Sequence, residues 1–356
     1  MNSGRDYKQL NSGNIPVYGT GGYMLSVNDK LSDTDAVGIG RKGTIDKPLY
    51  LKAPFWTVDT LFYCTSKENS DVKFIYLLFQ IINWKRYDES TGVPSLSKNT
   101  ISNIKTYVPK IKEQDYISKL FFSLDNTLQL HERKCEELTL IKKALLQKLF
   151  PKKDKDRPEV RYKNFSDAWE QRKLGEYANY RRGSFPQPYG KKEWYGGHSA
   201  MPFVQVVDVD DNLKLVNDTK QKISKLAQPK SVFVPAGKVI VTLQGSIGRV
   251  AVTQYPAYAD RTIMIFENYK FPTYEYFWAY VIKQKFEIEK LKAPGGTIKT
   301  ITKEALSNFK VFMPIYEEQK KVGDFFQQLD SLIALHQRKL EKLKQLKKFL
   351  LQNMFI

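Results

Sequence analysis

The chain has 356 residues, of which 42% are hydrophobic and 13% aromatic, enough to bury the cores of about two domains. This composition excludes a chain that is disordered throughout. No run reaches the roughly 18 uncharged apolar residues of a membrane span, and the first ten residues lack the apolar core of a secretory signal, so we expect a cytoplasmic protein. Cys64 and Cys135 are far apart in sequence, and we interpret both as reduced thiols.

The formal net charge of +19 is concentrated on the globular parts of the chain. Residues 111–163 and 315–356 together carry +7, which leaves +12 on the remainder. Positive charge among many aromatic side chains favours a polyanionic partner, most simply a nucleic acid. Charge alone is equally compatible with a solvated basic surface.

The predicted elements follow the same order twice. Residues 1–100 contain short β-type runs and then the aromatic run VKFIYLLFQIINWK, which is long enough for a helix. From Glu113 to Phe150 apolar residues recur every seven positions, which predicts one helix of about 55 Å. The predicted parts are a first mixed α/β domain (1–110), a first long helix (111–150), a polar linker (151–164), a second mixed α/β domain (165–314) and a second long helix (315–356).

An internal repeat relates the two long helices. A shift of 205 positions aligns residues 101–150 with 306–355 without a gap, and 21 of the 50 aligned positions are identical. A two-fold relation between the repeats would pair the helices as an antiparallel coiled coil, which gives an α+β fold of two domains joined by that coil. The alternative is that each helix packs on its own domain.

The residues expected to pair the helices lie on heptad seams. They are Ile117, Phe121, Leu124, Leu128, Leu138 and Leu145 in the first helix and Val322, Phe326, Leu329, Ile333, Leu340, Leu343 and Leu350 in the second. His131 and His336 occupy equivalent seam positions, where a polar side chain sets the register or forms a hydrogen bond more often than it binds metal.

Catalytic motifs are missing from the sequence. No phosphate-binding loop, zinc-ligand spacing or Asn-Pro-Pro-Tyr clamp for methyl transfer to a base is present. Asp208, Asp210 and Asp211 could bind a cation, but a carboxylate cluster after a strand is more typical of a turn. The segment GSIGRV, residues 245–250, predicts a tight turn that brings backbone close to a partner. The sequence therefore predicts a protein that binds without catalysing a reaction.

Three segments in this order carry a family resemblance. FSDAWEQRKLGE (165–176), LQGSIGRVAV (243–252) and PIYEEQKKVGDFFQQLDSLIALHQRKLEKLKQLKK (314–348) resemble the DNA-specificity subunit of type I restriction-modification systems. RKGTIDKPLYLKAPFWTVDTLFY (41–63) is a weaker copy of the middle segment.

The resemblance implies a non-catalytic subunit with two target-recognition domains, each of which reads one half of a split DNA sequence. It also implies that modification subunits, two in number, dock on the helices and that restriction subunits join through them. S-adenosylmethionine, ATP and magnesium are then expected in those partners, and no cofactor is expected in this chain.

Side-chain chemistry indicates candidate DNA contacts, because Arg and Lys suit guanine or phosphate and Gln suits adenine. In the second domain they are Arg181, Arg182, Lys191, Lys192, Gln244, Ser246, Arg249, Arg261, Lys292 and Lys299; in the first they are Arg41, Lys42, Thr44, Lys85, Arg86 and Lys98. For each of them a solvated surface role is the alternative.

The opening motif at 165–205 has no copy in the first half, since a shift of 205 would place Phe165 about 40 residues before Met1. We therefore expect the first recognition domain to be incomplete at its start. The chain would then be a fragment, a silent copy or a product completed by a partner.

Two other functions compete with DNA specificity. One is a coiled-coil scaffold whose basic domains bind RNA or acidic proteins; the other, a DNA-modifying enzyme, is disfavoured by the missing motifs.

Overall fold

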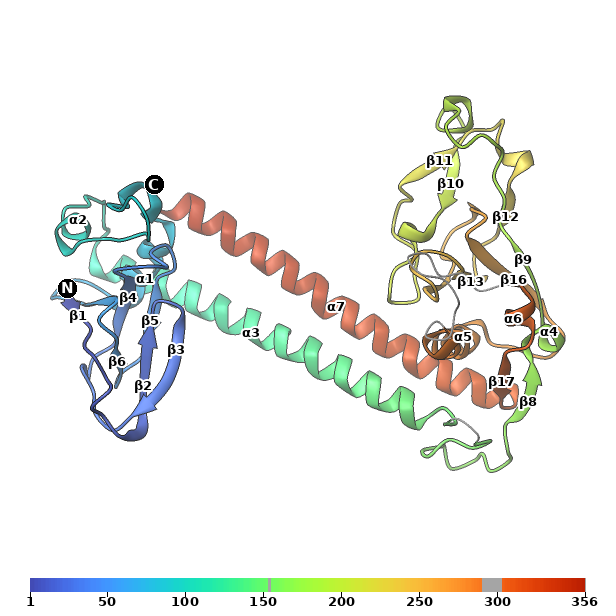
Figure 1. The fold of residues 1–356 in the computed structure, drawn as a ribbon, viewed down its shortest axis with the longest axis horizontal. Helices are drawn as coiled ribbons and strands as arrows, with labels where there is room; N and C mark the ends of the chain where they lie inside the picture. The colour runs from blue at the N-terminus through green and yellow to red at the C-terminus, as the bar shows by residue number, and fades with distance from the viewer. Residues whose placement is uncertain (153–154, 290–302, 356) are drawn as a thin grey trace. The chain divides into compact units, whose positions relative to one another are not determined.

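The chain forms two compact units. The computed structural model describes residues 1–152, 155–289 and 303–355. Unit 1 comprises Met1–Lys134 and His336–Ile356, and unit 2 comprises Cys135–Leu335. The long helices α3 (Ile111–Lys148) and α7 (Tyr316–Met354) contribute to both units (Figure 1). Each unit combines small sheets with helices, so the predicted α+β class is confirmed. In the described part of the chain, no helix has the length and apolar character needed to cross a lipid bilayer.

Unit 1 is built on two small sheets. Its strands are β1 (Asn2–Ser3), β2 (Ser12–Gly19), β3 (Gly22–Val27), β4 (Ala36–Gly40), β5 (Leu49–Leu51), β6 (Trp56–Thr57) and β7 (Leu61–Thr65), and its shorter helices are α1 (Val72–Ile81), η1 (Trp84–Tyr87) and α2 (Lys98–Ser102). The strand orders are β1-β7-β4-β5 and β3-β2-β6. β4 is buried along its whole length because it lies between β5 and β7 and beneath α1. The Asp71 side chain caps α1 by accepting a hydrogen bond from the Lys73 backbone N–H at 2.7 Å.

The described residues of unit 2 form three sheets. Its strands are β8 (Glu170–Lys173), β9 (Ala178–Arg182), β10 (Met201–Val204), β11 (Gln221–Ile223), β12 (Val232–Val234), β13 (Val239–Thr242), β14 (Val250–Val252), β15 (Ala257–Ala259), β16 (Ile263–Tyr269) and β17 (Lys310–Met313). Its shorter helices are α4 (Leu174–Tyr177), η2 (Lys192–Trp194), η3 (Val206–Asp208), η4 (Gln228–Lys230), α5 (Glu275–Glu289) and α6 (Lys303–Ser307). The strand orders are β11-β10-β15-β12, β14-β13-β16-β9 and β17-β8. The main core forms where Phe277, Trp278 and Ile282 of α5 pack on β13 and β14.

A glutamine near the start of each long helix makes the same contacts in both units. In unit 1 the Gln114 side chain accepts a hydrogen bond from the Asp71 backbone N–H at 3.0 Å; in unit 2 Gln319 accepts one from Tyr274 at 3.0 Å. Each amide also donates to the carbonyl of the proline five residues earlier, at 2.8 and 2.9 Å. The glutamine thus ties a long helix to the start of α1 or α5, and the sequence repeat is also a structural repeat.

A stacked phenylalanine pair repeats in the same way. Phe150 stacks on Phe277 in unit 2, with ring centres 5.2 Å apart, and Phe355 stacks on Phe74 in unit 1 at 5.3 Å. Phe150 and Phe355 are 205 positions apart, which is the period of the repeat. A phenylalanine one or two residues beyond each long helix therefore packs on the short helix of a globular part.

The segments of α3 and α7 in unit 1 run antiparallel. The Asp125 carboxylate pairs with Lys347 at 2.5 Å, and Glu132 pairs with Lys344 at 2.9 Å. As the residue number rises along α3, the number of its partner on α7 falls. The helices thus pack against each other in this unit and not only on their own domains.

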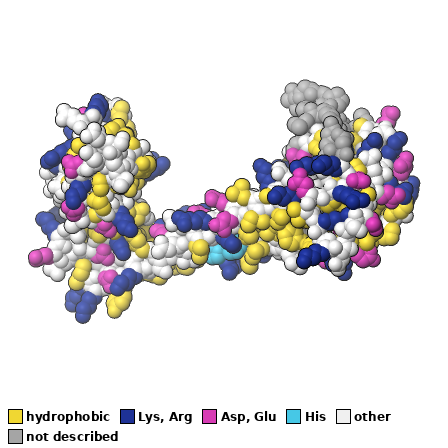
Figure 2. Space-filling model, turned by 90° about the horizontal axis from the view of Figure 1, so that it is seen from below, with side chains coloured by type: hydrophobic (Ala, Val, Ile, Leu, Met, Phe, Trp, Pro, Cys, Tyr) yellow, Lys and Arg dark blue, Asp and Glu magenta, His cyan; other side chains and the backbone are white. Residues whose placement is uncertain are grey.

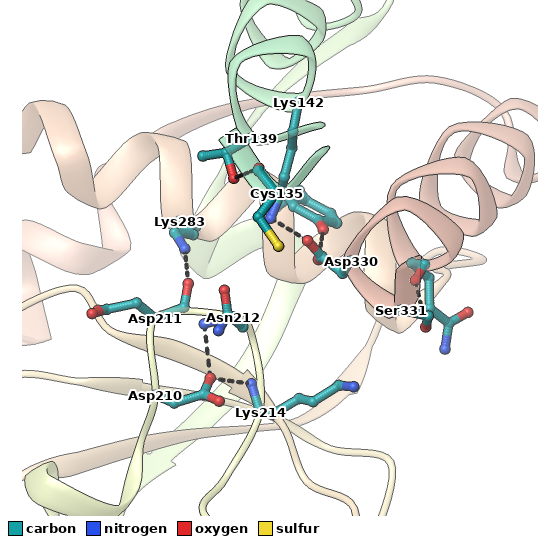
Figure 3. Close-up of polar contacts among 12 residues, drawn as sticks. Cys135, Thr139, Lys142, Asp210, Asp211, Asn212, Lys214, Lys283, Asp330 and Ser331 are labelled. Atoms are coloured by element: carbon teal, nitrogen blue, oxygen red, sulfur yellow. Dashed lines mark hydrogen bonds and ion pairs between the residues drawn. The ribbon is translucent and has the colours of Figure 1, made fainter. Parts of the chain in front are cut away.

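The segments of the two helices in unit 2 are joined by a more deeply buried pair. Lys142 pairs with Asp330, which also accepts a hydrogen bond from the Tyr280 hydroxyl (Figure 3). Lys142 and Asp330 are the copies of Lys347 and Asp125 under the 205-residue shift. Burial and the Asp330 carboxylate raise the pKa of Tyr280, so its hydroxyl remains protonated and donates.

The seam residues are largely out of solvent. Those that are buried are Ile117, Phe121, Leu124, Leu128, Leu138, Val322, Phe326 and Ile333, and those that are half-buried are Leu145, Leu329, Leu340, Leu343 and Leu350. His131 and His336 contact each other through their Nδ1 atoms, 2.8 Å apart, so one imidazole N–H donates to the other ring. Burial and the neighbouring His131 lower the pKa of His336, which favours the neutral ring that this contact needs.

The two equivalent ion pairs predict unequal contributions to stability. The side chains of Lys142 and Asp330 are 13% and 10% exposed, whereas those of Lys347 and Asp125 are 21% and 34% exposed. We expect Asp330→Ala to lower the free energy of unfolding by about 3–5 kcal/mol, because it leaves a buried ammonium group without a partner. The matched variant Asp125→Ala should lower it by about 0–1 kcal/mol. Urea denaturation of both variants measures the difference, and equal losses would contradict this account.

Candidate nucleic-acid interface

Two of the predicted arginines lie side by side on β9 but differ in their partners. Arg181 and Arg182 are opposite Ile265 and Met264 of β16, and both side chains are exposed. Arg181 Nε is 2.7 Å from a Glu267 carboxylate oxygen. The Arg182 side chain forms no ion pair with any other residue that the structure describes. Arg182 is therefore more available than Arg181 for an external anion.

A buried aspartate organises the loop before β16. The Asp260 carboxylate accepts hydrogen bonds from the backbone N–H and the hydroxyl of Thr262, at 2.9 and 2.6 Å, and from the Tyr189 hydroxyl. Burial and Asp260 raise the pKa of Tyr189, which keeps its hydroxyl protonated as a donor. The Arg261 guanidinium lies 5.3 Å from the centre of the Tyr189 ring, close enough for a cation–π interaction. The loop thus presents an exposed arginine over a fixed aromatic ring.

A second basic and aromatic group surrounds Trp194. The Nζ atoms of Lys191 and Lys230 lie 5.4 and 4.7 Å from the centre of its ring. Lys191 also pairs with Glu193 at 3.2 Å, and Lys192 is exposed beside them. Lys230 was not among the sequence candidates. No local pattern could have pointed to it, because its contact with Trp194 spans 36 residues of sequence.

The glycine-rich segment after β13 forms the predicted tight turn. Gly245 and Gly248 adopt positive φ angles of 66° and 82°, and the Gly248 N–H donates to the Thr242 carbonyl at 3.0 Å. A Cβ atom on Gly248 would lie 2.8 Å from Cβ of Phe286, so the turn packs directly on α5. The turn is confirmed, and the predicted contacts Gln244 and Ser246 lie within it, half-buried and exposed, respectively.

The aspartate cluster near this turn is used for local structure. Asp210 accepts hydrogen bonds from the backbone N–H groups of Asn212 and Lys214, at 2.7 and 3.0 Å, which confirms the predicted turn (Figure 3). Arg249 Nε is 3.4 Å from the Asp211 carboxylate, and the Lys283 ammonium donates to the Asp211 carbonyl. Arg249 is thus partly neutralised. Within the described ranges, no group of three potential metal-ligating side chains is brought together.

In unit 1 the structure gathers three of the predicted residues around one hollow. Arg41 and Lys98 lie 5.9 and 5.8 Å from the centre of the Phe62 ring. The hollow has a volume of 540 Å³ and is lined by Ser3, Arg41, Lys42, Phe62, Glu89, Ser95, Leu96, Ser97 and Lys98. Arg41 and Lys98 are 57 residues apart in sequence, and the fold brings them to the same aromatic ring.

The remaining candidate DNA contacts do not gather around one hollow or aromatic ring. Thr44, Lys85 and Arg86 do not line the hollow in unit 1, and Lys85 pairs with Asp46 at 3.1 Å. Lys292 and Lys299 lie outside the described residues. On the face shown in Figure 2, Lys and Arg side chains are spread over the globular part of each unit, with Asp and Glu among them. Position alone therefore does not separate base contacts from solvated charges.

Comparison with known proteins connects this arrangement to one family. A family model described as "Type I restriction modification DNA specificity domain" matches residues 3–140 and 166–345. Two sequences of Methanocaldococcus jannaschii, named as the MjaX and MjaVIII specificity subunits of type I restriction enzymes, are each 23% identical over 287 and 285 residues. These matches cover 77% and 74% of the chain but only 65% and 64% of the relatives' own lengths.

Solved structures show the same fold. The S subunit of a type I restriction-modification system from M. genitalium matches with a TM-score of 0.70 and 13% identity, over 100% of this chain and 93% of that one. A chain from a structural study of complex assembly and conformational transition of the type I R-M system matches with a TM-score of 0.54 and 16% identity, over 100% and 94% of the two chains. At these identities the likeness concerns the fold alone.

The contrast between the two arginines on β9 can be tested. We expect Arg182→Ala to weaken binding to a duplex that carries the preferred sequence by about 1–3 kcal/mol if the side chain contacts a base. Arg181→Ala should have the smaller effect, because Glu267 already holds that guanidinium. Fluorescence anisotropy with preferred and scrambled duplexes measures both losses. A loss for Arg182→Ala that is equal on both duplexes would identify a phosphate contact instead.

Proposed function

The chain belongs to the family of type I restriction modification DNA specificity domains, and on this premise we propose that it is the DNA-binding specificity subunit of a type I restriction-modification complex. The observation that carries this proposal is that the family model matches both repeats, each with a globular part and a long helix. Each repeat then reads one half of a split DNA target. The chain itself is not an enzyme in this proposal, and it supplies sequence selectivity to catalytic partners.

DNA reading is supported by the side chains that the fold gathers in each unit. Unit 1 offers Arg41 and Lys98 beside an aromatic ring, and unit 2 offers Arg182 and Arg261. Guanidinium groups can pair with guanine in two hydrogen bonds, whereas lysines suit phosphate oxygens. The net charge of +19 adds a salt-sensitive attraction for any DNA sequence. Base contacts then contribute the smaller, sequence-dependent part of the binding free energy.

Docking of modification subunits is supported by apolar side chains on the long helices that no described residue covers. Leu335 is exposed and lines a 500 Å³ groove with Gln327, Gln328, Ser331 and Leu332. Its copy in the first repeat, Leu130, is exposed as well. Hydrophobic side chains also gather along the helical segment in Figure 2. Equivalent apolar surfaces on the two repeats suit two copies of one partner, a modification subunit on each.

The chemistry would then be divided among chains. The modification subunits would hold S-adenosylmethionine, and the restriction subunits, which join through them, would use ATP and magnesium. This chain's own residues would position those partners by holding the two half-sites. Methylation would occur where this chain binds, because both sets of base contacts form only on DNA that contains both half-sites.

Methylation mapping in cells tests the proposed function. The chain is expressed with its modification subunit, and methylated positions in the cellular DNA are compared with those from cells that express the modification subunit alone. We expect new methylation at a motif of two fixed half-sites separated by a constant gap. Arg182→Ala should relax the sequence of one half-site and leave the other unchanged, whereas Arg41→Ala should affect the opposite half.

Two results would contradict the proposal. One is the absence of any methylation beyond the control, with the complex formed normally. The other is a contiguous motif with no gap, which two separate recognition domains would not produce. An RNA-binding scaffold would give the first result and would bind RNA at least as tightly as duplex DNA.

A further inference from the structure

The segment before α7 in unit 2 is covered by a paired strand. β17 and β8 are antiparallel, with Met313 opposite Glu170. The pairing continues one step further, because the Leu174 N–H donates to the Phe309 carbonyl at 2.7 Å. Val311 and Met313 are only 2% and 5% exposed, because they belong to the main core of unit 2. β8 therefore occupies the backbone edge of β17, whose buried side chains pack into the main core.

The equivalent segment before α3 in unit 1 has no such cover. Residues 105–108, which lie 205 positions before β17, form no hydrogen bond and no strand pair with any residue in the described part of the chain. Tyr107 and Val108, the copies of Phe312 and Met313, are 93% and 59% exposed. The sequence Lys-Thr-Tyr-Val is rich in residues that favour strands, so this segment is suited to pairing.

The ion pair that the covering segment forms in unit 2 also has no counterpart in the described part of unit 1. In unit 2, Arg161 donates two hydrogen bonds of 2.7 Å each to the Glu318 carboxylate, which is buried. The copy of Glu318 is Glu113, which is exposed and forms no ion pair with another described residue. A carboxylate that the fold buries and pairs in one repeat is thus left in solvent in the other.

The same difference holds for an aromatic contact. Trp169 precedes β8 and packs on Phe150 and Phe277, with ring centres 5.9 and 5.5 Å apart. The matching pair in unit 1, Phe355 and Phe74, stacks without a tryptophan among the described aromatic contacts. Strand pairing, ion pair and ring contact all come from one continuous segment, residues 161–174, whose contacts have no counterpart among the described residues of unit 1.

We propose that residues 105–108, with Glu113, form a docking site for an antiparallel β-strand that carries the same chemistry as residues 161–174. The second repeat identifies the chemistry of the occupant: an arginine, then a tryptophan followed directly by the strand Glu-Gln-Arg-Lys and a leucine. Its arginine would pair with Glu113, its tryptophan would pack on the Phe74–Phe355 stack, and its strand would pair with the backbone of residues 105–108. Strand addition to an open edge is a general mode of peptide recognition. The proposal does not depend on DNA recognition.

The probe is a synthetic peptide with the sequence of residues 161–177, added to the full chain without DNA. At saturating peptide we expect amide hydrogen exchange in residues 105–108 to slow by about tenfold or more, because a paired amide exchanges only when the pair opens. Exchange in β17 should be unchanged, since its own partner is already in place. A control peptide with Trp169→Ala and Arg161→Glu should give no protection.

A variant of the chain tests the strand pairing itself. The Leu174 contact with Phe309 places Val311 at a hydrogen-bonded position, since such positions alternate along antiparallel strands. Its copy is Thr106, so Thr106→Pro removes the donor and should abolish peptide binding. The matched variant Thr106→Ala keeps the N–H and should bind the peptide as the natural chain does.

Three outcomes would overturn the proposal. The peptide could fail to bind, could protect a region other than 105–108, or could bind Thr106→Pro as well as Thr106→Ala. A fourth would be protection of 105–108 that rises with the concentration of the chain alone, together with a dimer seen by native mass spectrometry. Residues 161–174 of a second copy are already paired within its own unit 2, so a different segment would then be the occupant.

Discussion

The antiparallel packing of α3 against α7 is the interaction on which the rest of the structure depends. In unit 1 the segments are held by the Asp125–Lys347 pair and in unit 2 by its copy, Lys142–Asp330. Because the two pairs are related by the repeat, one helix register satisfies both. The buried seam supplies most of the stabilisation, and the ion pairs oppose alternative registers, since a shifted helix would leave charges without partners.

This packing also anchors the globular parts. Gln114 and Gln319 join the starts of the long helices to α1 and α5, and Phe355 and Phe150 pack the residues after those helices on the same elements. Each globular part is therefore attached at the beginning of one long helix and at the end of the other. Under the proposed function such attachment would matter, because contacts to a half-site would lose selectivity if the domain that carries them could tilt.

The long helices could be predicted because their signal is local and repeated many times. Heptad spacing over about 38 residues identifies a helix without knowledge of its partner, and the duplication then suggested which face meets which. The turns at Gly245 and Asp210 were predictable for the same reason, since their chemistry lies within a few residues. Strand pairing was not predictable in this way. β8 and β17 are well over a hundred residues apart, and neither segment carries a sequence pattern that identifies the other as its partner.

The residue types of the candidate site could be predicted from the sequence, but their arrangement in space could not. Exposed arginines and lysines could be chosen from sequence, yet Glu267 beside Arg181 and Asp211 beside Arg249 became visible only when distant segments met. Lys230 was missed because it reaches Trp194 across the fold. Charge is a property of single residues, whereas availability for DNA depends on neighbours that the tertiary structure supplies.

Cross-linking at the histidine pair tests the helix packing most directly. The rings of His131 and His336 touch, so cysteines at both positions should be joined by a short bismaleimide within one chain. The reagent is applied to His131→Cys/His336→Cys in a chain whose Cys64 and Cys135 are replaced by alanine, with each single variant as a control. Intact mass spectrometry should find a cross-linked monomer in high yield for the double variant and none for the single variants. A double variant that remains unlinked, or that forms only linked dimers, would contradict antiparallel pairing of the two helices within one chain.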